Sequence, residues 1–589
     1  MSASSTNTPP AGFLWTLVIT VLVVLLMVLF GQPGFYLTPF REAQTAITAE
    51  YLAKGGPFFA YHTPVLGAPW SWPMEFPLFQ GLAALITMAG IPLDAAGRLL
   101  SFLSLIGCAL VAPRLLAELI GEKVHRGWVG LLVIASPLLL IYGTGFLIES
   151  MALLAALAYA WLALAGLRRA INPSETLLRS QVMLTVLGSI ACGIAAATIK
   201  PTTWAPSAVL VGLVAAVWLF TAQKAWSGRI RHLVLAGLIL FIPLFVGLLW
   251  VRYSDEVKKL HPLASSMVSG QMANWNYGTL PQKLSPIVWG TILLRGWILA
   301  LGPLGLLIPI YCGWGLWQAR REAPRLIAAL ALLAAYFAGP LVFTNLYFRH
   351  DYYSYANLAY LLMALVVLGI AQDLRKYPRF LGGALAASMA LTTLGYLALK
   401  QRFKDPELDQ VISVIKTSDE PGVIGFLGFD YSAAIPYATQ RRALMVGMQE
   451  PDQRLAAAVA ANANEHFAAI VALSEDYDPA AQVMRKGLGL ADAKVILLPS
   501  GIKIWTRDAL TLGVSATASD LGNYVRERAR SPAASSGVVW LRLPFSSKPG
   551  NGFELVYRRG NQAVILRSSD FSLSRLRNVW SEPAKPAPE

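Results

Sequence analysis

The feature that most constrains this chain is a series of apolar runs, each close to the length that crosses a bilayer. A helix of about 20 residues spans the hydrocarbon core of a membrane. The runs cover residues 12–30, 77–90, 97–117, 127–142, 146–166, 182–199, 203–221, 233–250, 290–311, 326–345, 355–371 and 380–398. Only 14% of the 589 residues are charged, against about 25% in a soluble domain. The chain is therefore predicted to be an α-helical polytopic membrane protein.

Five clusters of basic residues predict how the bundle faces. They fall in every second loop from run 97–117 onward, and positive residues in short loops mark the cytoplasmic side. The clusters are Arg114, Lys123 and Arg126; Arg168, Arg169 and Arg179; Lys224, Arg229 and Arg231; Arg320, Arg321 and Arg325; and Arg375, Lys376 and Arg379. The chain after residue 400 is then extracytoplasmic, and orientation explains the net charge of +15 better than nucleic-acid binding does.

The same alternation of basic loops decides whether the first two apolar runs cross the membrane. Run 77–90 is short for a span. If the N-terminus is cytoplasmic, this run does not cross, and we expect it to lie along the outer membrane face. Run 12–30 is interpreted as a retained span, because no positive charge precedes it and no small-residue cleavage site follows it. About eleven transmembrane helices result. An outside N-terminus with twelve spans is the alternative.

Domain organisation follows from where the apolar runs stop. Residues 1–399 are predicted to form the transmembrane domain, with large external segments at 31–96 and 252–289. Residues 400–589 are predicted to form a soluble extracytoplasmic α/β domain. Its expected strands are residues 422–429, 467–473 and 494–498, with a helix at 453–463 and further β-like stretches at 538–543 and 553–566. The cysteines Cys108, Cys192 and Cys312 all lie at apolar runs, so no disulfide is expected in this domain.

Ionisable residues from distant parts of the chain are predicted to share one layer at the outer face. They are Arg41, Glu42, Glu50, Glu75, Glu149, Lys200, Arg349, His350 and Asp351. Ionisable groups near a membrane are costly and usually functional. A carboxylate can take a proton from an acceptor hydroxyl, and a cation can stabilise the charge on a leaving phosphate. The set suits transfer of a group from a lipid phosphate to a hydroxyl.

Several short motifs in this layer resemble the C-type membrane glycosyltransferases. Residues 40–56 read FREAQTAITAEYLAKGG and residues 75–80 read EFPLFQ, like the acidic pair and later surface-helix motif of that family's first external loop. FLIES at 146–150, TIKPT at 198–202 and RHDYY at 349–353 match later motifs in order and sidedness. The family includes protein O-mannosyltransferases and bacterial lipid A aminoarabinose transferases. The resemblance covers residues 12–400.

The resemblance implies an inverting transferase of a hexosyl or pentosyl group from a polyprenyl-phosphate carrier, acting on the non-cytoplasmic side. The expected catalytic carboxylates are Glu42, Glu75 and Glu149. The expected phosphate-binding residues are Lys200, Arg349, His350 and Arg41. Because the family's leading aspartate aligns with Arg41, both Glu42 and Glu75 remain candidates for the base. The acceptor is a glycan, lipid or protein, and the expected location is a bacterial inner membrane with the C-terminal domain in the periplasm.

Other interpretations of these residues stay open. Asp351, Tyr352, Tyr353, Trp275 and Tyr277 are either substrate contacts or interfacial anchors. No cofactor and no metal site is expected from the spacing of His, Cys and acidic residues, although a divalent cation is compatible with the chemistry. The alternative functions are a flippase or transporter of a lipid-linked glycan, an oligosaccharide ligase or polymerase, and a non-enzymatic scaffold. Transporters tend to carry ionisable residues at mid-membrane and internal repeats, which this sequence lacks.

Overall fold

The computed structural model describes most of the chain. The described residues are 18, 38–120, 126–171, 179–221, 226–370, 373, 376, 378–402, 411–412, 414–416, 420–447, 452–497, 502–507, 538–542, 554–559 and 562–567. Apart from residue 18, the predicted first span at 12–30 lies outside them. Two compact units divide the chain, Met1–Leu510 and Thr511–Glu589.

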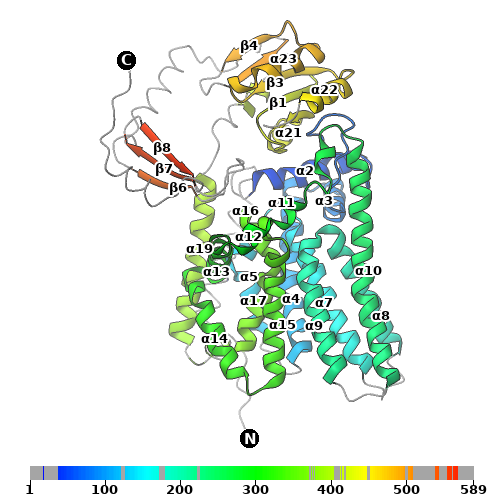
Figure 1. The fold of residues 1–589 in the computed structure, drawn as a ribbon, viewed down its shortest axis with the longest axis vertical. Helices are drawn as coiled ribbons and strands as arrows, with labels where there is room; N and C mark the ends of the chain where they lie inside the picture. Colours follow the sequence, from blue (N-terminus) through cyan, green and yellow to red (C-terminus); the bar gives the residue numbers. More distant parts are fainter. Residues whose placement is uncertain are drawn as a thin grey trace. The chain divides into compact units, whose positions relative to one another are not determined.

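The first unit contains a bundle of long apolar helices (Figure 1). Among the described residues, nine helical segments are long and apolar enough to cross a membrane, and each matches a predicted span. They are α4 (Leu93–Ile120), α7 (Glu149–Ile171), α8 (Arg179–Ile199), α9 (Pro201–Thr221), α10 (Trp226–Lys259), α13 (Pro286–Leu301) continued through η3 (Gly302–Leu307) into α14 (Ile308–Ala319), α15 (Ala323–Val342), η4 (Asp351–Ser354) continued into α17 (Tyr355–Leu368), and η5 (Pro378–Gly382) continued into α19 (Gly383–Arg402). The predicted class, a polytopic helical membrane protein, is confirmed.

The predicted span at 127–142 is divided into two helices. Helix α5 (Arg126–Ala135) ends before Ser136, and α6 (Pro137–Tyr142) begins at a proline. A proline fits the first position of a helix, where its missing N–H leaves no hydrogen bond unmade, but it ends the helix that precedes it. The hydroxyl of Ser136 donates to the carbonyl of Ala300 in α13 at 3.0 Å, which fixes the break inside the bundle.

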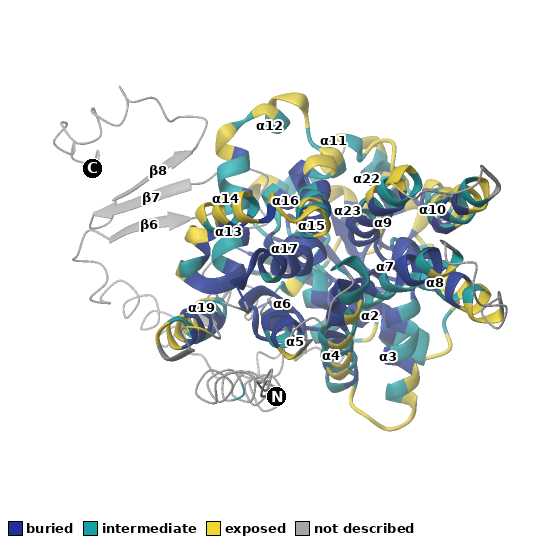
Figure 2. Ribbon diagram, turned by 90° about the horizontal axis from the view of Figure 1, so that it is seen from below, coloured by how far each residue is buried: buried dark blue, intermediate teal, exposed yellow. Residues whose placement is uncertain are grey.

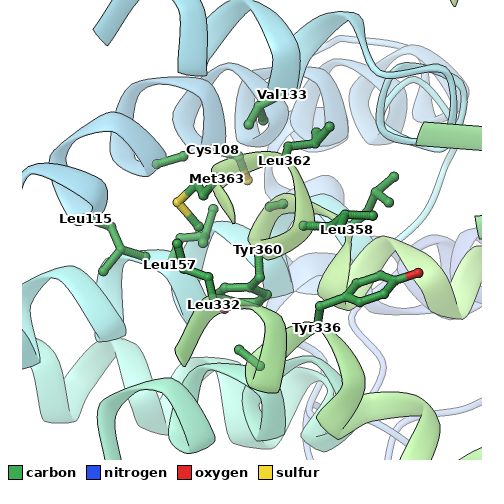
Figure 3. Close-up of a cluster of buried hydrophobic side chains, with 14 of the residues drawn as sticks. Cys108, Leu115, Val133, Leu157, Leu332, Tyr336, Leu358, Tyr360, Leu362 and Met363 are labelled. Atoms are coloured by element: carbon green, nitrogen blue, oxygen red, sulfur yellow. The ribbon is translucent and has the colours of Figure 1, made fainter. Parts of the chain in front are cut away.

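The centre of the bundle is packed from small residues and long side chains of α4, α7, α15 and α17. Figure 3 shows Cys108 and Leu115 of α4, Leu157 of α7, Leu332 and Tyr336 of α15 and four side chains of α17 in one cluster. Viewed along the helices, α17 and α7 are largely buried, whereas α10 carries many exposed residues (Figure 2). Exposed apolar residues on α10 fit a helix that faces lipid.

The directions of the helices place the described members of the basic clusters at one end of the bundle and the predicted site layer at the other. At the basic end, Arg168 pairs with Glu118 across α7 and α4 at 3.3 Å, and Arg231 donates to the carbonyl of Ala170 at 2.6 Å. At the opposite end, α7 begins at Glu149 and α8 ends at Ile199. Contacts across neighbouring helices thus agree with the order of loops on which the sidedness prediction rests.

Short helices cover the site end of the bundle. In the first external segment these are α2 (Pro39–Ala53) and α3 (Leu78–Met88), which pack against each other and against α4. Helix α3 has 11 residues, too few to cross a bilayer. In the later segments they are η2 (Ala264–Met267), α11 (Ala273–Tyr277), α12 (Leu280–Leu284) and α16 (Thr344–Arg349).

The first unit also contains a five-stranded sheet in the order β2-β1-β3-β5-β4. The strands are β1 (Val423–Leu427), β2 (Ala443–Val446), β3 (Phe467–Ala472), β4 (Lys494–Leu497) and β5 (Lys503–Thr506). Strand β1 pairs in parallel with β2 and β3, and β5 pairs antiparallel with β3 and β4. Helices α21 (Ala434–Thr439), α22 (Asp452–Ala461) and α23 (Asp478–Gly487) accompany the strands.

The predicted strands of the C-terminal region appear as β1, β3 and β4, and the predicted helix appears as α22. Strands β2 and β5, of four residues each, were not predicted. In the second unit, β6 (Val538–Arg542), β7 (Glu554–Arg559) and β8 (Gln562–Arg567) form an antiparallel sheet where β structure was expected. The predicted boundary at 399/400 stays a prediction.

Candidate active site

Two buried ion pairs form the centre of the candidate site. The ammonium of Lys200 lies 2.6 Å from Oε1 of Glu149, and the guanidinium of Arg41 lies 2.9 Å from Oε2 of Glu75. The Lys200 and Glu149 side chains are 8% and 1% exposed. Electrostatic interaction between Arg41 and both Glu75 and Glu149 joins the two pairs into one cluster. The structure thus brings together four of the residues that the sequence predicted to share a layer.

The helix ends explain how Lys200 and Glu149 meet. Lys200 occupies the corner between α8 and α9, where Pro201 starts the second helix. Glu149 is the first residue of α7, a position where the helix dipole favours a negative charge. The next residue, Ser150, shares a hydrogen bond of 2.7 Å with the hydroxyl of Tyr355. Because α7, α8 and α9 pack together, residues that are 51 positions apart in sequence become neighbours.

An aromatic wall faces the Lys200 ammonium. Its nitrogen lies 4.4 Å from the ring centroid of Tyr353 and 5.2 Å from that of Tyr352, both in η4. The His350 ring lies 5.2 Å from Tyr352, and Trp275 lies 6.0 Å from His350. A cation held against aromatic faces is stabilised by the negative face of each ring. The wall therefore gives the ammonium a second stabilising contact in addition to the Glu149 carboxylate.

Burial makes His350 a neutral residue. It lowers the pKa of this imidazole to about 4, and the positive charges of Arg295, Lys200 and Arg349 act in the same direction, against the single carboxylate of Asp351. At neutral pH the ring therefore carries no charge. It can donate or accept a hydrogen bond, and the binding of a phosphate by His350 stays a prediction.

The three predicted catalytic carboxylates have different surroundings. Both oxygens of Glu42 accept backbone N–H groups, Oε1 from Phe146 and Oε2 from Thr38, each at 3.2 Å. This carboxylate therefore fixes the turn that precedes α7 against the start of α2. Glu75 instead points both oxygens at side chains, since Oε1 accepts from Gln80 at 3.1 Å while Oε2 meets Arg41. Burial lowers the pKa of Arg41, but Glu75, Tyr352, Glu149 and Tyr353 together raise it by more, so the guanidinium stays charged.

Some buried acceptors around these pairs have an unused hydrogen-bonding position. In the described part of the chain, no donor reaches Oε2 of Glu149, Oε1 of Gln80 or the hydroxyl of Thr202. Buried polar atoms are nearly always hydrogen-bonded, either to protein or to a bound molecule. These atoms are therefore suited to receive hydroxyl groups of a small molecule or of water.

A second buried network lies on the other side of η4. Oδ2 of Asp351 accepts the hydroxyl of Tyr396, which shares a 2.8 Å hydrogen bond with Tyr142. Arg295 of α13 donates to the carbonyls of Tyr347 and Phe348 at the end of α16. The sequence analysis missed Arg295, although a lone arginine inside apolar run 290–311 is a signal of a buried polar contact. This network supports the segment that carries the aromatic wall.

The remaining predicted residues lie outside the ion-pair cluster. The Arg349 guanidinium lies 5.9 Å from the Phe348 ring. Tyr277 stacks on Phe343 at 5.6 Å, and Trp275 is 43% exposed. Within the described residues, no three His, Cys, Asp or Glu side chains lie close enough to hold a metal ion.

Comparison with known proteins finds similarity at the level of structure. No family model and no curated protein sequence matches the chain. A crystal structure of ArnT from Cupriavidus metallidurans bound to undecaprenyl phosphate aligns with a TM-score of 0.56 at 15% identity, over 85% of this chain and 98% of that one. The apo structure of the same protein aligns with a TM-score of 0.54 at 16% identity, over 85% and 99%.

A third, more distant structure is the archaeal oligosaccharyltransferase AglB from Archaeoglobus fulgidus. It aligns with a TM-score of 0.48 at 12% identity, over 86% of this chain and 75% of that one, which is too low to carry an argument. ArnT is a lipid A aminoarabinose transferase, and both proteins are C-type glycosyltransferases. The similarity to ArnT confirms the expected architecture: this chain is an integral membrane protein with the fold of the C-type glycosyltransferases.

Proposed function

We propose that this protein is a membrane glycosyltransferase that moves a sugar from a polyprenyl-phosphate carrier to an acceptor hydroxyl. The observation that carries the proposal is the buried Lys200–Glu149 pair, which lies beside the Arg41–Glu75 pair and against the aromatic wall. Charges are rarely buried at a helix corner unless they are used, because their desolvation is unfavourable. The fold shared with ArnT, which binds undecaprenyl phosphate, supports the same conclusion.

Lys200 is proposed to bind the donor phosphate. Its ammonium contacts both the Glu149 carboxylate and the Tyr353 ring, so it is held in position before the donor arrives. Fixed positive charge near a leaving phosphate stabilises the transition state without reorganisation. Arg41 would add a second cation, and neutral His350 would contribute a hydrogen bond.

Glu75 is proposed to be the general base. Both oxygens of Glu42 are used to fix backbone, whereas Glu75 is held only by side chains that can rearrange. The acceptor oxygen would give its proton to Glu75 and bond to the anomeric carbon. The bond from that carbon to the phosphate oxygen would break, and the electron pair would leave on the phosphate beside Lys200. One such displacement inverts the anomeric centre.

Sidedness determines where this reaction takes place. The basic loops lie at the end of the bundle opposite the ion pairs, which supports a non-cytoplasmic site. We propose a bacterial inner membrane, with the sheet of β1 to β5 in the periplasm. A glycan, a lipid or a protein would then reach Glu75 from outside.

The direct test uses purified protein, undecaprenyl phosphate as the binding probe, and undecaprenyl-phosphate hexose or pentose as donors. The variant K200Q should weaken phosphate binding by about tenfold or more, as expected for the loss of a charge-assisted hydrogen bond. E75Q should keep binding but lose formation of a new glycosidic bond, detected by mass spectrometry. Lys259, an exposed lysine at the same end of the bundle, gives the control K259Q.

Two outcomes would overturn the assignment. If K200Q and K259Q bind undecaprenyl phosphate equally well, Lys200 is not the phosphate site. If labelled lipid-linked glycan crosses liposome membranes without forming a glycosidic bond, the protein is a flippase.

A further inference from the structure

A turn at residues 63–70, closed where the N–H of Thr63 donates to the carbonyl of Trp70 at 3.0 Å, begins a segment of the first external loop, residues 63–75, that connects the soluble sheet to the ion-pair cluster. We call this segment the loop-one arm. Its first half pairs with the free edge of β2: the N–H of Ala443 donates to the carbonyl of Pro64 at 2.9 Å, and the N–H of Met445 donates to Val65 at 2.8 Å. Gly67 donates back to the carbonyl of Ala443 at 2.9 Å. The arm therefore hydrogen-bonds along the sheet edge, with one antiparallel bridge between Leu66 and Leu444.

Asn462, just after α22, anchors the arm from within the sheet domain. This side chain is fully buried; its Oδ1 accepts the N–H of Ala68 at 2.7 Å and its Nδ2 donates to the carbonyl of Ala458 at 2.8 Å. Gly67 has φ +83°, and a Cβ there would lie 2.6 Å from the Asn462 amide nitrogen. The fit leaves no room for the arm to shift past this side chain.

Three side chains from α10 and the segment after it hold the opposite side of the arm. The hydroxyl of Ser254 donates to the carbonyl of Pro73 at 2.6 Å, and the indole of Trp250 donates to Met74 at 3.0 Å. Nε2 of His261 meets the carbonyl of Gly67 at 3.1 Å, while its Nδ1 accepts two backbone N–H groups. Burial lowers the pKa of His261, so the ring is neutral and its proton sits on Nε2.

The arm ends on the proposed base. Tyr61 accepts the N–H of Met74 at 2.7 Å and donates to the carbonyl of Glu75 at 2.9 Å. The N–H of Phe76 then donates to the carbonyl of Thr198, two residues before Lys200. Hydrogen bonds from named partners thus hold the arm at residues 64–68 and again at residues 73–76.

We propose that the soluble sheet positions Glu75 through the loop-one arm, and that Asn462 is a positioning residue of this connection. Only the expected effect on catalysis rests on the proposed function. The hydrogen-bonded connection from the sheet to Glu75 does not depend on it. The direct ion-pair partner of Lys200 is Glu149 on α7, outside the arm, so loosening the arm should disturb the base more than the contact of Lys200 with a phosphate.

The test compares N462A with N464A, which truncates an exposed asparagine two residues further on. Hydrogen–deuterium exchange of the full-length protein is the first readout. In N462A, amides of residues 63–76 should exchange at least tenfold faster, while those of β1 and β3 keep their protection. The second readout is transfer, where kcat should fall about tenfold or more with unchanged affinity for undecaprenyl phosphate, because small misplacements of a reacting group slow catalysis strongly. N464A should match the wild type in both.

The outcomes separate this proposal from the assigned function. Unchanged exchange of residues 63–76 in N462A would overturn the connection even in an active transferase. If the wild-type protein shows no transferase activity, the proposed function is wrong. The hydrogen–deuterium exchange of residues 63–76 would still show whether Asn462 holds the loop-one arm. If N462A does not fold, N462S keeps a small polar group at the site but is too short to reach Ala68, and the same comparison applies.

Discussion

Removing the charges of the Lys200–Glu149 pair one at a time gives the sharpest test of the site. At an effective dielectric constant of 20, two unit charges 2.6 Å apart attract by about 6 kcal/mol, most of which offsets the loss of hydration. In K200M the Glu149 carboxylate stays buried without its partner. We expect the free energy of unfolding to fall by about 3–5 kcal/mol.

The opposite variant, E149Q, should be less damaging. The ammonium of Lys200 keeps the Tyr353 ring at 4.4 Å, a contact that contributes about 2 kcal/mol when desolvated. We therefore expect E149Q to destabilise by about 2 kcal/mol less than K200M. The double variant K200M/E149Q removes both buried charges, so its loss of stability should be smaller than the sum of the two single losses by a coupling of about 2–3 kcal/mol.

Unfolding in detergent, followed by tryptophan fluorescence for all four proteins, measures this cycle. Binding of undecaprenyl phosphate measured beside it should be lost in K200M and should not return in the double variant, which separates stability from function. If the two single losses add in the double variant to within about 0.5 kcal/mol, the two charges are not coupled and the description of the site is wrong.

Two further predictions concern single residues. Because burial lowers the pKa of His350 to about 4, below its ordinary 6.5, the unfolded chain binds more protons between these values. Stability should therefore fall as pH drops from about 6.5 towards 4, and unfolding curves of H350Q should lack that part of the loss. Gly302 has φ +72°, and a Cβ there would lie 2.3 Å from the carbonyl oxygen and hydroxyl of Ser388. G302A should lower the unfolding temperature by several degrees, whereas G290A, on the same helix with open space, should leave it unchanged or raise it slightly.

The architecture was largely predictable because span length and loop charge are strong signals. A run of about 20 apolar residues has few alternatives to a membrane helix. The alternation of basic loops then indicates which helix ends lie on the same side of the membrane. For this reason the sequence alone assigns Glu149 and Lys200 to one layer. Their activity on a substrate stays a prediction.

The pairing of side chains was not predictable, because sequence separation carries no information about it. Nothing in the sequence distinguishes Glu42, which fixes the backbone of Phe146, from Glu75, which meets Arg41. The loop-one arm was equally hidden. Its partner β2 has four residues, and the pairing uses backbone groups that every residue carries.

The arm also imposes an order on biogenesis. Ala68 and its partner Asn462 are 394 residues apart in sequence. At synthesis rates of about 5–20 residues per second, the arm would leave the ribosome roughly 20–80 s before the sheet edge that completes it. During that interval residues 64–68 lack the sheet edge and the Asn462 side chain that hold them, so this part of the first external loop reaches its final conformation only after residue 462 has been translated.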